Sequence, residues 1–228
     1  MEKYYPVLKN SALFSGMENG EIEKLLSCLD CNKKEYKKGE LVQLAGDRVV
    51  AAGLLLEGSL IAENISYSGE EDIISAFLPG DIFGDVLMSA GGKQSPVNIT
   101  ASSDSTALFI PFESIMGGCE NNCPLHWRLR INLLSEISAK FLALNRKIRY
   151  LSIRSLRRRI AEFLLNTASD KNSLTFETGL SRQEMAALLG ANRTALSREL
   201  GRMQQSGMIS FYKGSFKIED LSALKSVL

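Results

Sequence analysis

The chain has 228 residues, of which 45% are hydrophobic and 23% charged, a composition that is ordinary for a globular protein. This length is enough for two domains with separate cores. The sequence excludes a membrane helix, because no apolar run reaches the roughly 20 residues that such a helix needs. Residues 1–6 do not read as a signal peptide, so we expect a cytoplasmic protein.

The net charge of +1 is unevenly distributed along the chain. From Ser152 to the end there are 12 Lys or Arg residues and 7 Asp or Glu residues, whereas residues 1–151 contain 15 and 19. A basic C-terminal third indicates contact with a polyanion such as nucleic acid. The alternative is a solvated basic surface that meets no partner.

The first part of the chain combines a short helix with many short strands. Residues 13–29 have the spacing of an amphipathic helix. From about Glu35, short apolar stretches alternate with turn residues, and from Gly46 to Gly80 glycines recur every 11 or 12 residues. Glycine allows the positive φ at which strands reverse. This pattern predicts an antiparallel β-roll, or jelly roll, and we assign residues 1–124 to this domain.

A heptad spacing follows Pro124, which is a favourable first residue for a helix. We define the seam as six apolar residues that are 3 or 4 positions apart: Leu134, Ile137, Phe141, Leu144, Ile148 and Leu151. A helix over residues 125–151 would carry them on one narrow face and would be about 40 Å long. Upstream, Arg130 stands where the spacing needs an apolar residue. We interpret the seam as a homodimer interface; packing of a single helix on its own domain is the alternative.

The last part of the chain, residues 152–228, contains two capped helices joined by a glycine. Ser181 and Glu184 form a capping box before a short helix that ends at Gly190, and Asn192 caps a second helix over residues 193–203. A helix-turn-helix needs a small residue, a left-handed turn and a buried apolar residue at positions that are filled by Ala186, Gly190 and Leu196. A hairpin over residues 208–218, with Lys213 at its tip, is the expected wing.

The second of these helices has a basic and hydroxylic arc. Taking about 100° per residue, four side chains fall within roughly 140°: Arg193, Thr194, Ser197 and Arg198. Guanidinium and hydroxyl groups are suited to guanine edges and phosphates in a major groove. The alternative is a helical hairpin with a solvated basic face. The sequence therefore predicts a winged helix-turn-helix that binds double-stranded DNA.

Several phrases of the sequence carry a family resemblance: LFSG at 13–16, LEGSL at 56–60, FLPGDIFG at 77–84 and LSRQE at 180–184. In these phrases and in the order of its parts, the chain resembles the Crp/Fnr family of the catabolite activator protein and the fumarate–nitrate regulator. The resemblance implies an α+β protein with a β-roll sensor domain, a dimerisation helix and a winged helix-turn-helix. It implies a transcription regulator, with RNA polymerase as an expected partner. An enzyme is not expected, because the chain has one histidine and no phosphate-loop or nucleophile motif.

The resemblance also implies roles for individual residues. Arg193 and Arg198 would read bases, with Ser197 beside the second of them. Phosphate contacts are implied for Ser181, Gln183 and Asn192, and the expected DNA-binding set also includes Arg182, Thr194 and Lys213. Thr194 stands where the family usually has a glutamate that pairs with a cytosine, so the familiar half-site is not expected.

The segment after Phe83 bears on the effector. Cyclic-nucleotide binders of the family have Gly-Glu here and an Arg-Ser or Arg-Thr pair about ten residues later. This chain has Gly84-Asp85 and then Gln94-Ser95, and Gln94 cannot give a phosphate the bonds of a guanidinium. We expect an organic effector other than cyclic AMP at these four residues, and an anionic one is an open alternative. A cyclic-nucleotide-binding interaction module, whose C-terminal part only packs, is the alternative function.

The four cysteines offer a rival sensing mechanism. Cys28 and Cys31 lie close together in the sequence, and so do Cys119 and Cys123, which are followed by His126. Such residues could bind zinc or an iron–sulfur cluster, or could form a redox disulfide. Their spacing differs from that of the fumarate–nitrate regulator, and Cys28 is placed to face the core of its helix. We therefore expect reduced, inert thiols and no metal or other cofactor.

Overall fold

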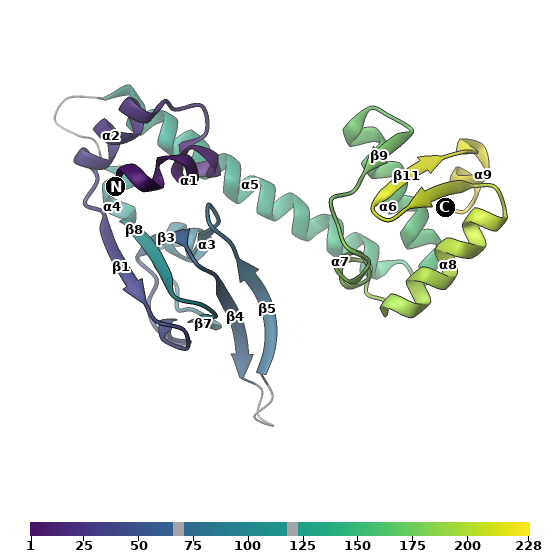
Figure 1. The fold of residues 1–228 in the computed structure, drawn as a ribbon, viewed down its shortest axis with the longest axis horizontal. Helices are drawn as coiled ribbons and strands as arrows, with labels where there is room; N and C mark the ends of the chain where they lie inside the picture. The colour runs from purple at the N-terminus through teal and green to yellow at the C-terminus, as the bar shows by residue number, and fades with distance from the viewer. Residues whose placement is uncertain (66–70, 118–122) are drawn as a thin grey trace. The chain divides into compact units, whose positions relative to one another are not determined.

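The computed structural model describes residues 1–65, 71–117 and 123–228. The chain forms two compact units, Met1–Ala139 and Lys140–Leu228. The division falls within a long helix, α5 (Pro124–Ser152), which therefore contributes residues to both units (Figure 1). The predicted helix over residues 125–151 is confirmed to within one residue at each end. In the described ranges, no helix combines the length and the apolar character needed to cross a bilayer.

Two four-stranded antiparallel sheets form the body of the first unit. One sheet has the order β1-β8-β3-β6 and the other the order β2-β7-β4-β5. The strands are β1 (Asn32–Tyr36), β2 (Leu41–Gln43), β3 (Ala51–Glu57), β4 (Leu60–Ile65), β5 (Glu71–Phe77), β6 (Ile82–Phe83), β7 (Asn98–Ala101) and β8 (Ser105–Pro111). This arrangement confirms the predicted β-roll.

The regularly spaced glycines lie at turns of the roll. Gly46, Gly58 and Gly80 all have positive φ, and the fourth, Gly69, lies outside the described residues. At Gly58, where φ is +89°, a Cβ atom would also lie 2.3 Å from the carbonyl oxygen of Asp104. The turn between β3 and β4 therefore needs glycine for two reasons, its backbone conformation and its close approach to a neighbouring loop.

Short helices cover one end of the roll. They are η1 (Glu2–Tyr4), α1 (Tyr5–Asn10), η2 (Ala12–Phe14), α2 (Asn19–Cys28), α3 (Asp85–Ser89) and α4 (Phe112–Met116). The single helix predicted over residues 13–29 is wrong at its start. The chain turns at Gly16, where φ is +73°, and α2 begins behind a capping box formed by Glu18 and Glu21.

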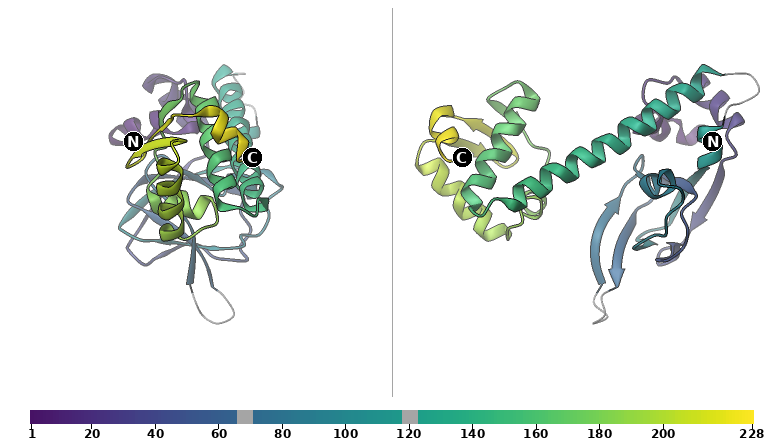
Figure 2. Two further views of the ribbon diagram at one scale, coloured as in Figure 1. Left: turned by 90° about the vertical axis from the view of Figure 1, so that its right-hand side faces the viewer. Right: turned by 180° about the vertical axis from the view of Figure 1, so that it is seen from behind.

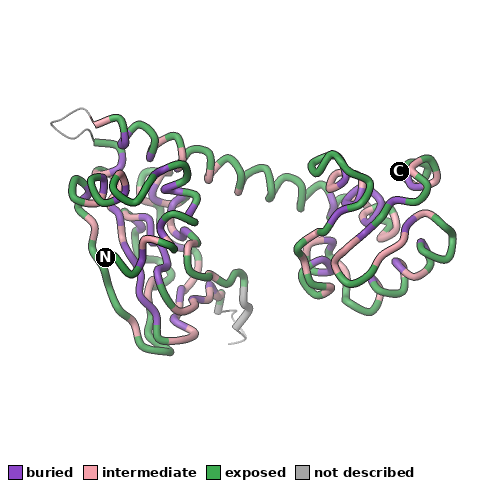
Figure 3. The backbone as a smooth tube through the Cα atoms, turned by 45° about the horizontal axis from the view of Figure 1, so that its top comes forward, coloured by how far each residue is buried: buried purple, intermediate pink, exposed green. Residues whose placement is uncertain are grey.

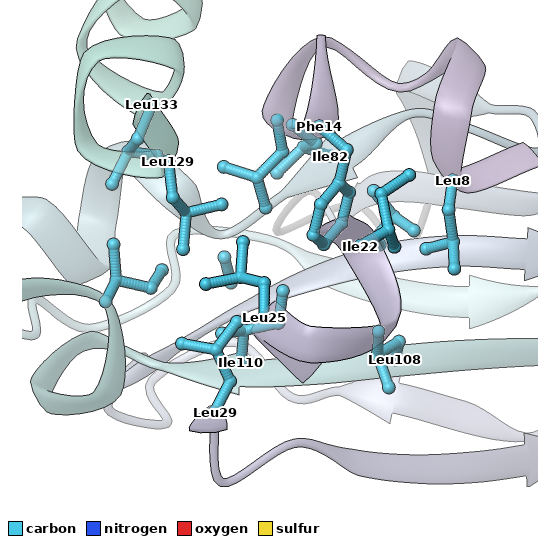
Figure 4. Close-up of a cluster of buried hydrophobic side chains, with 14 of the residues drawn as sticks. Leu8, Phe14, Ile22, Leu25, Leu29, Ile82, Leu108, Ile110, Leu129 and Leu133 are labelled. Carbon is cyan, nitrogen blue, oxygen red and sulfur yellow. The ribbon is translucent and has the colours of Figure 1, made fainter. Parts of the chain in front are cut away.

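The first unit has two apolar clusters. In one, side chains from the N-terminal helices, such as Phe14 and Leu25, pack with Ile110 of β8 and with Leu129 and Leu133 of α5 (Figure 4). This cluster anchors the first half of α5 on the unit. The other cluster lies between the two sheets and contains Leu55, Leu60, Ala62, Phe83, Ile99, Ala101 and Ala107.

The second unit combines helices with a small sheet. Its elements after α5 are α6 (Leu156–Lys171), β9 (Thr175–Glu177), α7 (Arg182–Leu188), α8 (Arg193–Gln205), β10 (Ile209–Tyr212), β11 (Ser215–Ile218) and α9 (Leu221–Ser226). The sheet order is β10-β11-β9, and β10 and β11 form an antiparallel hairpin after α8 (Figure 2). The predicted order of two short helices followed by a wing is confirmed.

The end of α5 is fixed to α6 by polar contacts within the second unit. Arg146 Nη1 donates to Asp170 Oδ2 at 2.6 Å, and Asn166 Nδ2 donates to the Tyr150 hydroxyl at 3.3 Å. Arg149 also forms an ion pair with Glu162. Residues 141–149 of α5, which include Arg146 and Arg149, are all exposed (Figure 3).

Candidate functional site

The turn between α7 and α8 has the local bonds that the sequence predicts. The Ser181 hydroxyl accepts from the Glu184 N–H at 3.2 Å, and the Ser181 N–H donates to Glu184 Oε2 at 2.7 Å. Gly190 has φ +59°, and Asn192 Oδ1 accepts from the Ala195 N–H at 2.7 Å. Ala186 and Leu196 are buried, as the motif requires. The helix-turn-helix geometry is therefore confirmed.

The helix α8 has two distinct faces. Its inner face consists of Leu196, Leu200 and Met203, each fully buried. Its outer face carries the predicted arc, and Arg193, Thr194, Ser197 and Arg198 are all exposed. Within the part of the chain that the structure describes, no ion pair or hydrogen bond engages the guanidinium of Arg193 or Arg198. Both groups are thus available to an external ligand.

The helix α8 is fixed to α6 by a largely buried carboxylate. Glu199, whose side chain is 14% exposed, accepts from Arg157 Nε at 2.5 Å and from Arg202 Nη1 at 3.2 Å. This contact sets the position of α8 on the unit. Sequence reasoning missed it, because Arg157 and Glu199 are 42 residues apart and neither stands in a recognisable pattern.

A second arginine, Arg159 of α6, holds the turn itself. Its Nε donates to the carbonyl of Ile153 at 2.6 Å, and its Nη1 donates to the carbonyls of Leu189 at 2.8 Å and Gly190 at 3.1 Å. The guanidinium therefore joins the segment after α5 to the end of α7. These partners are backbone atoms, so no residue pattern in the sequence could reveal them.

The wing is attached to α7 through Arg182. The guanidinium carbon lies 4.8 Å from the ring centre of Phe211 and 5.1 Å from that of Phe216, a cation–π arrangement. Burial against these rings lowers the pKa of Arg182. The hairpin tip carries Lys213, which is exposed and has φ +52°. Arg182 was predicted as a DNA contact, and in the free chain its guanidinium packs on the wing.

The predicted phosphate contacts lie at the starts of the two helices. Ser181 and Asn192 are exposed, and both use a side-chain oxygen as a helix cap. The Asn192 amide protons can still be donated to an anion, whereas the Ser181 hydroxyl also bonds to the Glu184 carboxylate and lowers its pKa. Gln183, in the first turn of α7, is exposed as well. The exposed predicted contacts thus come from both helix starts, the arc of α8 and the wing.

A separate cavity of about 220 Å³ lies in the β-roll of the first unit. It is lined by Gln43, Val49, Ala51, Ala62, Phe77, Phe83, Gly84, Val86, Leu87, Ser95, Pro96, Val97, Ile99 and Phe109. Two of the four predicted effector residues, Gly84 and Ser95, are among them. The other two are not: Asp85 is buried at the start of α3, and Gln94 is exposed and bridges to Arg48.

Comparison with known proteins accounts for both units. Residues 33–122 match the cyclic nucleotide-binding domain, and residues 158–227 match the Crp-like helix-turn-helix domain. The chain is a Crp/Fnr family regulator. The anaerobic regulatory protein of Haemophilus influenzae is 29% identical over 209 residues, 90% of this chain and 79% of the relative. The fumarate and nitrate reduction regulatory protein of Salmonella typhimurium is 26% identical over 214 residues, 91% of this chain and 82% of the relative.

A solved structure supports the fold of this Crp/Fnr regulator. The catabolite activator protein of Thermus thermophilus is 21% identical and superposes with a TM-score of 0.54, covering 95% of this chain and 98% of that one. The expected fold, a β-rich sensor-like domain followed by a long helix and a helix-turn-helix, is therefore borne out. The chain is a DNA-binding regulator, and the two relatives named above are regulatory proteins rather than enzymes.

The cysteines of this Crp/Fnr regulator differ from one another in exposure. Cys28 is exposed, so the prediction that it faces the core is wrong; Cys31 packs on the core instead, and burial raises the pKa of its thiol to about 12. Cys123 is partly buried, and Cys119 lies outside the described residues. Among the residues that the structure describes, no group of three or more His, Cys, Asp or Glu is arranged to hold a metal ion.

Proposed function

We propose that this Crp/Fnr regulator binds DNA as a homodimer, with α8 in the major groove and a small effector in the β-roll. One observation carries the proposal: the exposed face of α8 presents two unengaged guanidinium groups, while its opposite face is fully buried. A rigidly held helix with an exposed basic start is the arrangement with which helix-turn-helix proteins read base edges. Arg193 and Arg198 are the proposed base readers, with Thr194 and Ser197 beside them.

The remaining DNA contacts are proposed from their positions. Ser181, Gln183 and Asn192 start the two helices, where backbone N–H groups and side-chain donors suit a phosphate. Lys213 extends the interface from the tip of the wing. Arg182 holds the wing on α7, and we propose that it influences DNA binding chiefly through that contact.

The dimer is proposed from the seam on α5. Most of the seam is exposed in the single chain, with relative exposures of 61% for Leu134, 62% for Phe141 and 57% for Leu144. Ile137 is partly buried on the first unit. A contiguous row of large exposed apolar side chains marks an association surface, and its heptad spacing suits a parallel pair of helices. A two-fold dimer would place two α8 helices about 34 Å apart, one helical turn of DNA.

Arg130 interrupts the heptad spacing, and its hydrogen bonds explain why an arginine stands at this position. Its Nε donates to the carbonyl of Ile115 at 3.0 Å, and its Nη2 donates to that of Gly117 at 2.7 Å. These bonds hold α5 on the end of α4. The proposed interface therefore starts after Arg130 in the sequence, at Leu134.

We propose cytoplasmic action on transcription, with RNA polymerase as the further partner.

The proposal is tested by capturing genomic fragments bound to the full chain and measuring mobility shifts on the enriched fragments. The expected result is a shared sequence pattern and a retarded complex that the Arg193→Ala, Arg198→Ala double variant loses. Lys225→Ala on α9 is the matched control, because it removes an exposed cation that lies off the recognition arc. Equal binding to enriched and unrelated fragments would contradict sequence-specific recognition.

A further inference from the structure

The walls of the β-roll cavity are mainly apolar and aromatic. Three phenylalanine rings from three strands meet there: the ring centres of Phe77 and Phe83 are 5.6 Å apart, and those of Phe83 and Phe109 are 5.8 Å apart. The second pair is nearly perpendicular, at 87°. Such an arrangement leaves ring faces and edges available to a further flat apolar group. The cavity is thus built for contact with hydrocarbon or aromatic surface.

Few polar groups are left to meet a ligand. Among the described residues that line the cavity, Gln43 and Ser95 have the polar side chains. The Ser95 hydroxyl donates to the carbonyl of Val97 at 2.7 Å and accepts from the N–H of Val97 at 3.4 Å. Because Ser95 is engaged by its own loop, the Gln43 carboxamide is the polar side chain best able to meet a ligand.

The lining of the cavity is unfavourable for an anion. No Lys, Arg or His is among the described residues that line the cavity. Arg48 lies next to Gln94, and its Nε and Nη2 donate to the carbonyls of Gly92 at 3.0 Å and Gly91 at 3.2 Å. A phosphate or carboxylate brought into the cavity would lose its hydration without gaining a cation.

The volume limits the size of the ligand. An engineered apolar cavity of about 150 Å³ stays dry and binds benzene, so a cavity of about 220 Å³ suits one or two fused rings. We infer that the effector of this regulator is an uncharged, largely apolar small molecule with a ring system of that size. That this ligand regulates DNA binding rests on the proposed function, whereas its binding depends on the cavity alone.

The test compares two probes of matched shape, 1-naphthamide and 1-naphthoate, together with cyclic AMP. Titration calorimetry on the full chain without DNA should detect 1-naphthamide and find it at least about tenfold tighter than 1-naphthoate, since a lone buried carboxylate is costly. Ala51→Leu, which fills the cavity, should abolish 1-naphthamide binding. Ala76→Leu on the exposed side of β5 is the control and should leave binding unchanged.

A second variant keeps the inference testable if Ala51→Leu does not fold. Gln43→Lys places a cation in the wall and should reverse the preference toward 1-naphthoate. Tighter binding of 1-naphthoate or cyclic AMP than of 1-naphthamide by the wild type, or no detectable 1-naphthamide binding, would overturn the inference. A chain that binds 1-naphthamide but no DNA would instead overturn the proposed function and leave the ligand class standing.

Discussion

Gly190 in the turn between α7 and α8 lies directly against Leu151 at the end of α5. A Cβ atom on Gly190 would be 2.3 Å from Cδ2 of Leu151, and the φ of +59° at Gly190 is itself unfavourable for other residues. Leu151 is also the last residue of the seam. Within the second unit, the turn that orients the recognition helix therefore rests on the same helix that carries the proposed dimer interface.

Gly190→Ala should destabilise the second unit and weaken DNA binding. The added methyl group must displace Leu151 while the backbone stays in a strained region, which costs about 1–3 kcal/mol. Urea denaturation followed by circular dichroism measures the loss. Gly201→Ala is the control, because Gly201 lies inside α8, where a Cβ atom would meet no neighbouring group within 4 Å, and it should stabilise by about 1 kcal/mol. Equal effects of the two substitutions would show that the contact with Leu151 does not matter.

Substitutions on α8 and the wing should have different signatures. Arg193→Ala or Arg198→Ala should cost about 1–3 kcal/mol on the preferred site and relax base choice there. Lys213→Ala should weaken binding evenly across sequences and reduce the salt slope by about 1. Fluorescence anisotropy at several salt concentrations separates the two effects. Unchanged affinity in both arginine variants would remove α8 from the role of recognition helix.

The seam predicts a specific assembly defect. The double substitution Phe141→Lys, Leu144→Lys should give monomers, because four lysines would face one another across a two-fold interface. Ala139→Lys, Leu142→Lys adds the same charge at exposed positions off the seam and should remain dimeric. Sedimentation velocity at micromolar concentration distinguishes these outcomes. A monomeric wild type, or a control that dissociates equally, would contradict the dimer.

The two N-terminal cysteines should differ in reactivity. A thiol reacts as its thiolate, and burial raises the pKa of Cys31 to about 12, so below that pH it stays protonated. Cys28 is exposed. Treatment of the native protein with iodoacetamide at pH 8, followed by peptide mass spectrometry, should find Cys28 alkylated and Cys31 unmodified. Rapid alkylation of Cys31 would contradict its packed position, and denaturant should make both cysteines react.

Local signals in the sequence account for the parts that could be predicted. The capping residues Ser181 and Asn192 and the turn residue Gly190 define the helix-turn-helix because their partners lie within a few residues. The heptad spacing similarly defines α5. Contacts made at long range were missed, including Arg157 with Glu199 and Arg159 with the turn, since they depend on how α6 packs.

Exposure on short elements was also hard to predict. The helix α2 buries Ile22 and Leu25 and ends at Cys28, which is exposed, whereas Cys31 lies beyond the helix and packs on the core. In the β-roll, the sequence placed Gly84 and Ser95 at the cavity but also included Asp85 and Gln94. In each pair, two neighbouring residues differ in whether they line the cavity. The local backbone conformation of the loop decides which of them does, and sequence spacing does not determine that conformation.

The central claim, sequence-specific recognition by a two-fold dimer, is tested most directly by selecting bound sequences from a random double-stranded DNA library. The two α8 helices of a dimer face successive major grooves, so the half-site centres should be about 10 base pairs apart. The predicted result is enrichment of an inverted repeat with that spacing, lost in the Phe141→Lys, Leu144→Lys variant. Enrichment of no sequence, or of a single unrepeated site bound equally well by that variant, would contradict the account.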